Sequence, residues 1–396
     1  MPALQGPASL ARSRGPLLLL AALNFTVGFG AFVVVGVVPP LALAFGVTEA
    51  AAGQVMTAYA VAYALASPVA VALTGRWDRR SVLMLGALLF ALGAVACALA
   101  SSFALLLAAR VVMAFGGGLA TPVAAAVSLG LVRADERGRA LALVFGGLTL
   151  AQAVGVPAGA WIGYGFGWPA AFAAAAALAL LSATMLGRLP RGLAAPVTRL
   201  ATLREALARP DLVAAVAFTA AFIAGLYVLY TFLAAFMEAR LGLGRDGVAL
   251  VLLVYGAGAV AGNWMGGRLS DRIGPRRTLV ALCLAQPVLM GATTLLPFDA
   301  SPAGIAAATV VLFLWAASSW AFMVPQQARL AALDEARTPV LFALNAAAIY
   351  LGASLGAAAG GAVLAGTGYA ALGPAGGAVC LLALATLPLA ARLRRA

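Results

Sequence analysis

The sequence has no histidine and no lysine, and only 9% of its 396 residues are charged. Without histidine it has no imidazole base, no histidine proton relay and no histidine ligand for zinc. Its three cysteines lie far apart, each inside an apolar run, and we interpret them as small buried side chains rather than as a redox or metal site. The apolar segments hold no cluster of histidine, aspartate or cysteine, and no Walker-type phosphate loop is present. We therefore predict that the protein is not an enzyme, has no cofactor or metal, and is not driven directly by ATP.

The chain is instead rich in apolar residues, with 64% hydrophobic residues and a mean hydropathy of +1.05. Soluble domains are about half apolar and about a quarter charged. At about 20 residues per spanning helix, the length accommodates twelve spans with room for loops. We predict an all-α integral membrane protein, with transmembrane helices at residues 16–44, 50–74, 81–101, 103–131, 140–165, 168–188, 212–237, 247–267, 278–297, 303–325, 338–366 and 369–391.

All 25 basic residues are arginine, and their distribution along the chain is one-sided. Twenty-two of them precede the first span, follow the last one, or lie in the even-numbered connections. The odd-numbered connections hold only Arg240 and Arg245. By the positive-inside rule both termini are cytoplasmic. We predict a multi-pass protein of the bacterial inner membrane. The net charge of +13 therefore indicates contact with membrane lipids rather than with nucleic acid.

The longest connection, residues 189–211, divides the spans into two sets of six. We predict a first bundle over residues 1–188, a cytoplasmic linker over 189–211 and a second bundle over 212–396. Residues 198–209 fit either a short amphipathic helix on the membrane surface or a plain linker with snorkelling arginines.

A shared signature follows the second span of each half. The copy after span 8 reads Gly-Arg-Leu-Ser-Asp-Arg-Ile-Gly-Pro-Arg-Arg, and the copy after span 2 is a shorter Gly-Arg-Trp-Asp-Arg-Arg. We interpret each as a tight turn in which glycine lets helices approach, aspartate accepts hydrogen bonds at a helix N-terminus, and arginines anchor at the surface. The positive-inside rule alone explains the arginines but not the common order. The residues of this signature are Gly75, Asp78, Arg79, Arg80, Gly267, Asp271, Arg272, Gly274, Arg276 and Arg277.

These stretches resemble the loop signature of the major facilitator superfamily, specifically its twelve-span drug:proton antiporter branch of sugar-efflux and chloramphenicol-resistance-like permeases. Other motifs agree with this resemblance, namely Arg110 with Gly116 and Gly118, residues 155–159 (Gly-Val-Pro-Ala-Gly), Gly167-Trp168 with Phe172, and Asn345 with the glycines of span 11. The resemblance implies two pseudo-symmetric six-helix bundles, a substrate site between them near the midplane, alternating access by rocking, and a working monomer.

Glycines recur in spans 5 and 11, which occupy matching places in the two halves. Small residues at intervals of about four let helices pack closely and slide, and a proline within a helix can kink it. We predict a hinge or gate role for Gly155, Pro157, Gly159, Gly352, Gly356 and Gly360. The alternative is ordinary close packing of helices.

The acidic residues avoid membrane depth, since all twelve lie in loops or at span ends. In the resembling family, span 1 carries a protonatable glutamate, and the frame from Phe25 to Pro39 places Ala31 at that position. A carboxyl group with a raised pKa is what lets protonation drive a conformational switch. Proton coupling would then use Asp78, Asp271, Glu238 or a proton carried by the substrate.

Arg110 is the one charged residue predicted inside a span, and arginine does not relieve its burial by losing a proton. Either backbone carbonyls, Gln152 or water satisfy it, or an anionic substrate completes its site. Polar and aromatic residues at similar depth are candidates for the cavity wall, although some tyrosines and tryptophans belong to the interfacial belt. The predicted cavity residues are Asn24, Thr26, Tyr59, Tyr63, Arg110, Gln152, Tyr227, Tyr230, Tyr255, Asn263, Trp315 and Asn345.

These features predict a secondary transporter that exports small organic molecules, drug- or sugar-like, with proton coupling. An uncoupled facilitator and an organic-anion transporter that uses Arg110 as counter-ion are the alternatives within transport. A non-transporting membrane sensor on the same fold is a further alternative, although both halves keep the glycine-rich helices expected of a moving transporter.

Overall fold

The structure is a computed structural model that describes residues 10–133, 136–193, 200–334 and 337–387. It is helical, as predicted, and the helices of the first half coincide with the first six predicted spans. They are α1 (Leu10–Phe45), α2 (Glu49–Ala52), α3 (Gln54–Leu73), α4 (Arg79–Ala98), α5 (Phe103–Leu131), α6 (Arg137–Leu150), a π-helical turn (Ala151–Gly155), α7 (Val156–Phe166) and α8 (Trp168–Leu186).

The second half repeats this plan. After α9 (Leu200–Leu207), its helices are α10 (Pro210–Tyr230), α11 (Leu233–Leu241), α12 (Arg245–Ile273), α13 (Pro275–Leu295), α14 (Pro302–Trp320), α15 (Met323–Leu333), α16 (Thr338–Thr367), a 3-10 turn (Tyr369–Ala371) and α17 (Leu372–Ala383). Eleven described helices are long and apolar enough to cross a membrane. The twelfth predicted span, 369–391, coincides with the shorter apolar helix Tyr369–Ala383, and its residues 388–391 lie outside the described residues.

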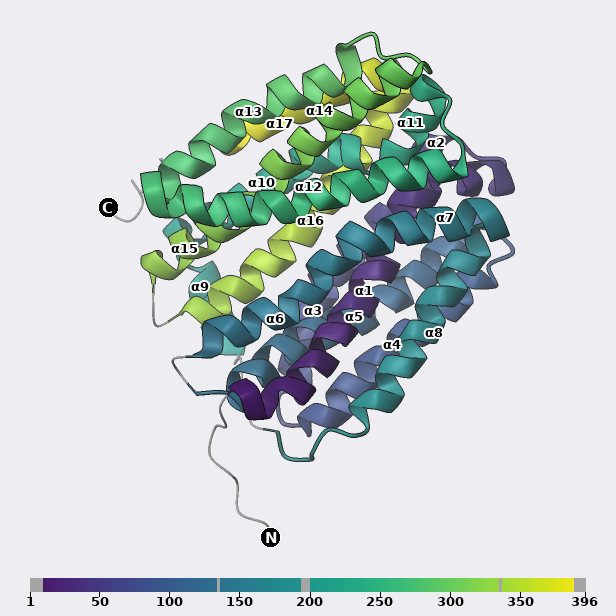
Figure 1. Ribbon diagram of the computed structural model, residues 1–396. Coiled ribbons are helices and arrows are strands. Elements are labelled where there is room, and N and C mark those ends of the chain that lie inside the picture. The colour runs from purple at the N-terminus through teal and green to yellow at the C-terminus, as the bar shows by residue number, and fades with distance from the viewer. Residues whose placement is uncertain (1–9, 134–135, 194–199, 335–336, 388–396) are drawn as a thin grey trace.

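Helices α1 to α8 form one bundle and α10 to α17 a second, and the two stand side by side in Figure 1. We call them the first and the second bundle. The predicted boundaries at residues 188 and 211 stay a prediction, with α10 beginning at Pro210.

Local sequence sets where many helices begin. Side chains of Thr48, Asp78, Ser102 and Ser301 accept a hydrogen bond from the first turn of α2, α4, α5 and α14 respectively. Proline occupies the first turn of several other helices, where its missing N–H costs no hydrogen bond. Gly167 and Gly274 have φ of +86° and +87°, which lets α7 turn directly into α8 and α12 into α13.

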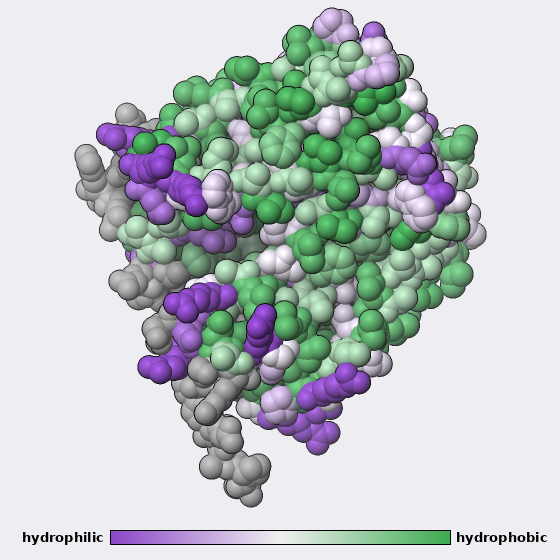
Figure 2. All heavy atoms as spheres, in the orientation of Figure 1, coloured by the Kyte–Doolittle hydropathy of each residue, from purple (hydrophilic) through white to green (hydrophobic). Residues whose placement is uncertain are grey.

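The outer surface of the molecule is apolar along the length of the helices. Leucines and valines on α3 and α13 point outward, with Leu65 70% and Val288 69% exposed. Figure 2 shows a broad hydrophobic belt with hydrophilic residues gathered toward the two ends. Soluble monomers rarely expose a contiguous apolar surface of this size. The belt therefore marks the surface that faces lipid.

Several of the predicted spans are interrupted. Val37 has non-helical backbone angles just before the prolines at 39 and 40. The span containing Pro157 changes to a π-helical turn immediately before that residue, as expected where a proline removes a backbone donor. Short breaks also separate α10 from α11 and α14 from α15. The span that contains Pro157 thus has a π turn in its middle, while a kink at this proline stays a prediction.

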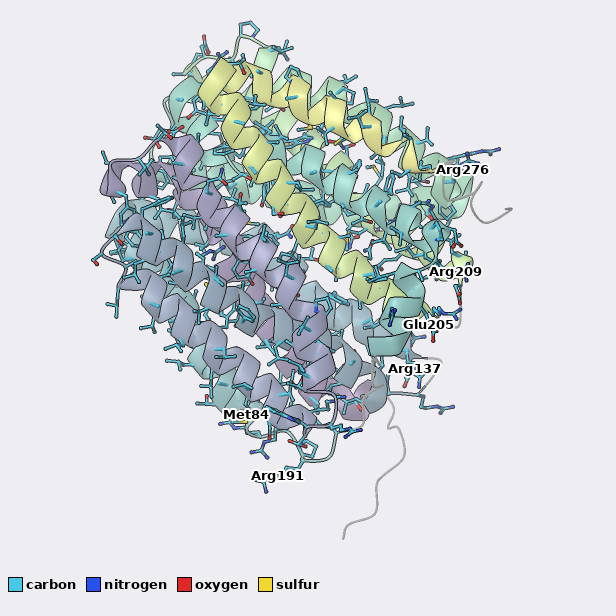
Figure 3. All side chains as sticks on the ribbon, turned by 180° about the vertical axis from the view of Figure 1, so that it is seen from behind. Met84, Arg137, Arg191, Glu205, Arg209 and Arg276 are labelled. Carbon is cyan, nitrogen blue, oxygen red and sulfur yellow. The ribbon has the colours of Figure 1, made fainter. Side chains whose placement is uncertain are left out.

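Arginines gather at one end of the molecule, which we call the arginine-rich end. Figure 3 shows Arg137, Arg191, Arg209 and Arg276 at this end, together with Glu205 of α9. The opposite end, where Arg240 and Arg245 lie, is the arginine-poor end. This segregation agrees with the sequence, while the placement of the arginine-rich end in the cytoplasm stays a prediction.

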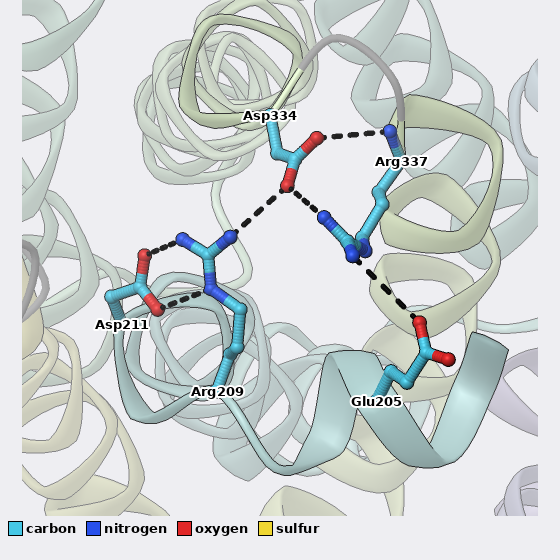
Figure 4. A network of polar contacts seen from close by, with 5 residues as sticks. All are labelled: Glu205, Arg209, Asp211, Asp334 and Arg337. Carbon is cyan, nitrogen blue, oxygen red and sulfur yellow. Dashed lines mark hydrogen bonds and ion pairs between the residues drawn. The ribbon is translucent and has the colours of Figure 1, made fainter. Parts of the chain in front are cut away.

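At the arginine-rich end an ionic network ties α9 to the second bundle (Figure 4). Arg209 binds Asp211 at 2.6 Å and Asp334 at 3.1 Å, and Arg337 binds Asp334 at 2.9 Å and Glu205 at 3.7 Å. Burial opposes ionisation of Asp334, but its contacts with Arg337 and Arg209 hold the pKa of that carboxyl below its ordinary value. Of the two alternatives for residues 198–209, the structure therefore has a helix, Leu200–Leu207, and its Glu205 contacts Arg337 of the second bundle.

The two ends differ in how the bundles meet. At the arginine-poor end polar side chains of the two bundles contact each other, and a Cβ on Gly53 of the first bundle would meet Phe232 of the second at 2.5 Å. At the arginine-rich end the surface is hollowed between two groups of hydrophilic residues (Figure 2). The structure is therefore closed at the arginine-poor end and open at the other.

Candidate functional site

Arg110 of α5 lies at the centre of the first bundle and is completely buried. Its guanidinium donates to three backbone carbonyls, from Nη1 to Gly30 at 2.7 Å, from Nη2 to Ala31 at 3.0 Å and from Nε to Val55 at 3.2 Å. A fourth donor contact reaches the sulfur of Met113 at 3.5 Å. Arg110 thus joins α5 to α1 and α3.

Aromatic rings complete the surroundings of this guanidinium. It lies over the ring of Tyr59 at 4.3 Å and near that of Phe172 at 5.8 Å. Ala31, at the position expected for a glutamate, offers only its carbonyl. Of the partners considered from sequence, backbone carbonyls rather than Gln152 satisfy the donors, and the cation is stabilised by dipoles and a ring face instead of a carboxylate.

A stack of tyrosines crosses from the first bundle to the second, between α3 and α16. The rings of Tyr63 and Tyr350 lie 3.6 Å apart between centroids, and Tyr59 lies 6.1 Å from each. All three are buried. The structure thus brings the predicted residues Tyr59, Tyr63 and Arg110 together, and adds Tyr350, which sequence reasoning missed although it lies five residues after the predicted Asn345.

The second bundle holds its own aromatic row. Tyr230 stacks on Tyr255 at 5.1 Å, and edge-to-face contacts at 5.3 Å join Tyr227 to Tyr230 and Tyr255 to Trp315. Gln286 of α13 accepts from Trp315 Nε1 at 3.1 Å and donates to Ser318 at 3.0 Å. Four of the predicted cavity residues therefore form one cluster.

The other predicted cavity residues lie apart from these clusters. Asn24 donates to the carbonyl of Val144 at 3.0 Å, and the Thr26 and Ser182 hydroxyls lie 3.0 Å apart, so both join α1 to helices of its own bundle. The Asn345 amide oxygen accepts from Thr219 at 2.5 Å, beside Gln326, in a polar cluster within the second bundle. Gln152 is buried in the π turn, and Asn263 of α12 is partly exposed.

The two signature copies differ in structure. Asp78 is the N-cap of α4, accepts from Ser81 N at 3.0 Å, and also accepts from Gly192 N at 2.8 Å. Burial alone would raise the pKa of the Asp78 carboxyl. The hydrogen bonds from Gly192 and Ser81 nevertheless hold this pKa below its ordinary value. Arg79 donates to the carbonyl of Gly75 at 2.8 Å, and Arg80 to that of Leu189 at 3.1 Å, so this copy anchors the start of the linker.

In the second copy α12 continues to Ile273, so Gly267, Asp271 and Arg272 belong to its last turns. Only Gly274, with positive φ, forms the turn, and Asp271 is not at a helix N-terminus. The predicted tight turn over the whole stretch is therefore corrected. Arg276 and Arg277 open α13, and Arg268 lies 3.3 Å from the Trp264 ring at the apolar surface.

The glycines of the predicted gate lie against the first helix of their own bundle. A Cβ on Gly155, the last residue of the π turn, would meet Phe29 of α1, and a Cβ on Gly159 of α7 would meet Val33 of α1. On α16, a Cβ on Gly352, Gly356 or Gly360 would meet the carbonyl of Ala220, Ala224 or Val228 of α10. The same close approach thus occurs in both bundles, while a gating role for these residues stays a prediction.

Comparison with known proteins places these features in a family. The family model described as Major Facilitator Superfamily matches residues 20–334. The inner membrane transport protein YdhP of Escherichia coli K12 is 32% identical over 379 residues, covering 95% of this chain and 96% of that one. The chloramphenicol resistance protein of Streptomyces lividans is 37% identical over 280 residues, covering 69% of this chain and 70% of that one.

Solved structures show the same fold at lower identity. A D-xylose–proton symporter superposes with a TM-score of 0.75 at 18% identity, covering 96% of this chain and 98% of that one. A bacterial homologue of the human lysosomal transporter Spinster, in an inward-facing and unoccupied conformation, gives a TM-score of 0.69 at 22% identity over 96% and 94% of the two chains.

Proposed function

This chain belongs to the Major Facilitator Superfamily, and from that premise we propose that it exports small organic molecules across the bacterial inner membrane by alternating access. The arginine-rich end then faces the cytoplasm, and the closed arginine-poor end faces outward. In this orientation the hollow at the arginine-rich end opens toward the cytoplasm, and we propose that the state is inward-open.

The observation that carries the proposal is the composition of this seam. Tyr63 and Tyr350 stack across it, and the aromatic row of Tyr227, Tyr230 and Tyr255 lies in the second bundle. In the described part of the chain, every aspartate and glutamate lies in a loop or near a helix end. Aromatic walls with a few hydroxyl groups suit neutral molecules that stack and form hydrogen bonds. We propose neutral aromatic drugs as the substrate class, and chloramphenicol, from the name of one relative, as the first compound to test.

We further propose that export is coupled to protons. With Ala31 in place of a glutamate, the candidate proton acceptors are acids at helix ends. Asp78 is held by hydrogen bonds within the cytoplasmic region and Asp271 lies in the last turns of α12, whereas Glu238 is bonded across the two bundles. Of these three acids, Glu238 is therefore the one whose surroundings change when the bundles move.

Arg110 supports the alternative of an organic-anion transporter less well. Its donors are occupied by backbone carbonyls and a methionine sulfur, and its side chain is fully buried. An anion would have to displace these bonds before it reached the guanidinium.

The test is transport of labelled chloramphenicol in proteoliposomes, with and without an imposed pH gradient. Proton-coupled export predicts accumulation only with the gradient, in the direction opposite to proton flow. Flux that merely equilibrates would establish the uncoupled facilitator, and no flux of this or other neutral drugs would favour the sensor.

A pair of variants links such flux to the seam. We expect Tyr63→Leu, which removes the stack on Tyr350, to reduce chloramphenicol flux, because the ring forms part of the proposed wall. Trp264→Leu is the matched control, since that aromatic residue is 65% exposed on the apolar surface. Equal loss in both variants would contradict a site at the seam.

A further inference from the structure

The closed end of the molecule is held by hydrogen bonds that run from one bundle to the other. Tyr164 of α7 donates to Glu238 Oε2 of α11 at 2.7 Å. Tyr369, which follows α16, donates to Glu49 Oε2 of α2. Each tyrosine and its glutamate thus belong to different bundles.

The two pairs are reciprocal. Tyr164 and Tyr369 flank the corners between the fifth and sixth spans of their bundles, where Gly167 and Gly368 have φ of +86° and +78°. The glutamates lie where the first span of each bundle ends, with Glu238 in the last turn of α11 and Glu49 opening α2 after α1. Each bundle therefore contributes a tyrosine from the connection between its fifth and sixth spans and a glutamate from the end of its first span.

From this arrangement we propose that the Tyr164–Glu238 and Tyr369–Glu49 pairs form a reciprocal clasp that holds the outward end shut. The four side chains are positioning residues for alternating access, a role that rests on the proposed function. An ionised carboxylate makes its hydrogen bond stronger than a neutral acceptor would. Because both pairs join the two bundles, the bundles separate at this end only when both bonds break.

The surroundings suit a bond that must break and re-form. Glu49, Glu238 and Tyr164 line one pocket of about 840 Å³, together with Trp168 and the two adjacent prolines, Pro39 and Pro40, inside α1. Tyr164, Glu49 and Tyr369 are partly buried and Glu238 is exposed, so water can solvate the groups once they part.

A third inter-bundle contact lies beside the clasp on the exposed rim. Trp161 donates to Asp246 Oδ1 at 3.1 Å, and Arg245 lies 3.6 Å from the Trp161 ring while its Nε donates to the Trp161 carbonyl at 3.0 Å. This contact involves only one corner of the first bundle. The clasp therefore predicts that the tyrosine hydroxyls control closure even while this rim contact is intact.

The experiment measures the outward opening directly, by electron–electron resonance between two nitroxide labels. The labels go on Ser101→Cys and Ala303→Cys, exposed positions at this end of the first and second bundles. The native cysteines Cys97, Cys283 and Cys380 are buried, which limits background labelling. The full chain is measured in lipid nanodiscs without substrate.

We expect Tyr164→Phe with Tyr369→Phe to raise the ratio of long to short label distances about tenfold, the equivalent of about 1.4 kcal/mol. Phenylalanine keeps the ring and removes only the hydroxyl donor. Glu49→Gln with Glu238→Gln tests the same bonds from the acceptor side and is expected to shift the ratio in the same direction. Asp299→Asn is the matched control, because that acid lies at the same end but its bonds reach only Ser301.

Distance distributions that match the unmodified chain in both double variants would overturn the clasp. A shift in Asp299→Asn as large as in the double variants would also overturn it, because it would show a general effect of outward charge. Since the labels report opening without any transported compound, failure to move chloramphenicol would contradict the proposed function and leave this result unaffected.

Discussion

At the scale of a single residue, Arg110 shows how a charge is kept inside this protein. Its neighbours are backbone carbonyls of α1 and α3, a methionine sulfur and the Tyr59 ring. The N–H groups of the planar guanidinium have fixed directions and reach three carbonyls on two helices. A lysine ammonium cannot do this equally well. The residue therefore acts as a link among three helices.

We expect Arg110→Ala to lower the unfolding free energy by about 2 to 4 kcal/mol, because several buried hydrogen bonds are lost at once. The unfolding free energy of Arg110→Lys should lie between those of the unmodified protein and Arg110→Ala, since lysine keeps the charge but not the planar set of N–H donors. Thermal unfolding of the purified protein in detergent measures this, with Arg240→Ala, an exposed arginine, as control. An Arg110→Ala protein of normal stability that no longer transports would instead assign Arg110 to the substrate.

At the scale of an element, the π turn before Pro157 forms a contact between bundles. A Cβ on Gly256 of α12 would overlap the backbone of Ala153 in this turn. The two bundles therefore approach at backbone distance at a point where one helix is locally rewound. Glycine is required at that point because any side chain would separate the helices.

We expect Gly256→Leu to leave each bundle folded but to reduce transport at least about tenfold, because a leucine would hold the two bundles apart at this crossing. The readouts are chloramphenicol flux and the melting temperature. Gly146→Leu is the control, since the space around that glycine of α6 is open. Normal flux in Gly256→Leu would show that close approach at this crossing is not needed for movement.

At the scale of the whole molecule, the arginines at one end and the apolar belt are the basis of the orientation that we propose in the bilayer. The apolar belt matches the hydrocarbon interior of the bilayer. The arginines gathered at one end favour the cytoplasmic surface with its anionic lipids. The outward end, by this reasoning, is the end that the tyrosine–glutamate pairs close. Orientation and conformational state are thus connected.

Labelling of whole cells with a membrane-impermeant maleimide tests this orientation. We expect Ser101→Cys, at the corner between α4 and α5, to react from outside. Arg191→Cys, which follows α8, should react only after the cells are opened. The reverse pattern would place the arginine-rich end outside and turn the proposed export into import.

Local composition determined the helical spans, the belt and the segregation of charge, because hydropathy and turn residues act over a few positions of the chain. The sequence also showed that Arg110 needed partners and that Ala31 offered no carboxyl. Only the tertiary structure decided which partners were used. Tyr63 meets Tyr350, Asn24 serves packing within its own bundle, and Glu49 meets Tyr369, which is 320 residues away. Such pairs depend on the tilt and rotation of each helix against its neighbours, which a single hydropathy pattern leaves open.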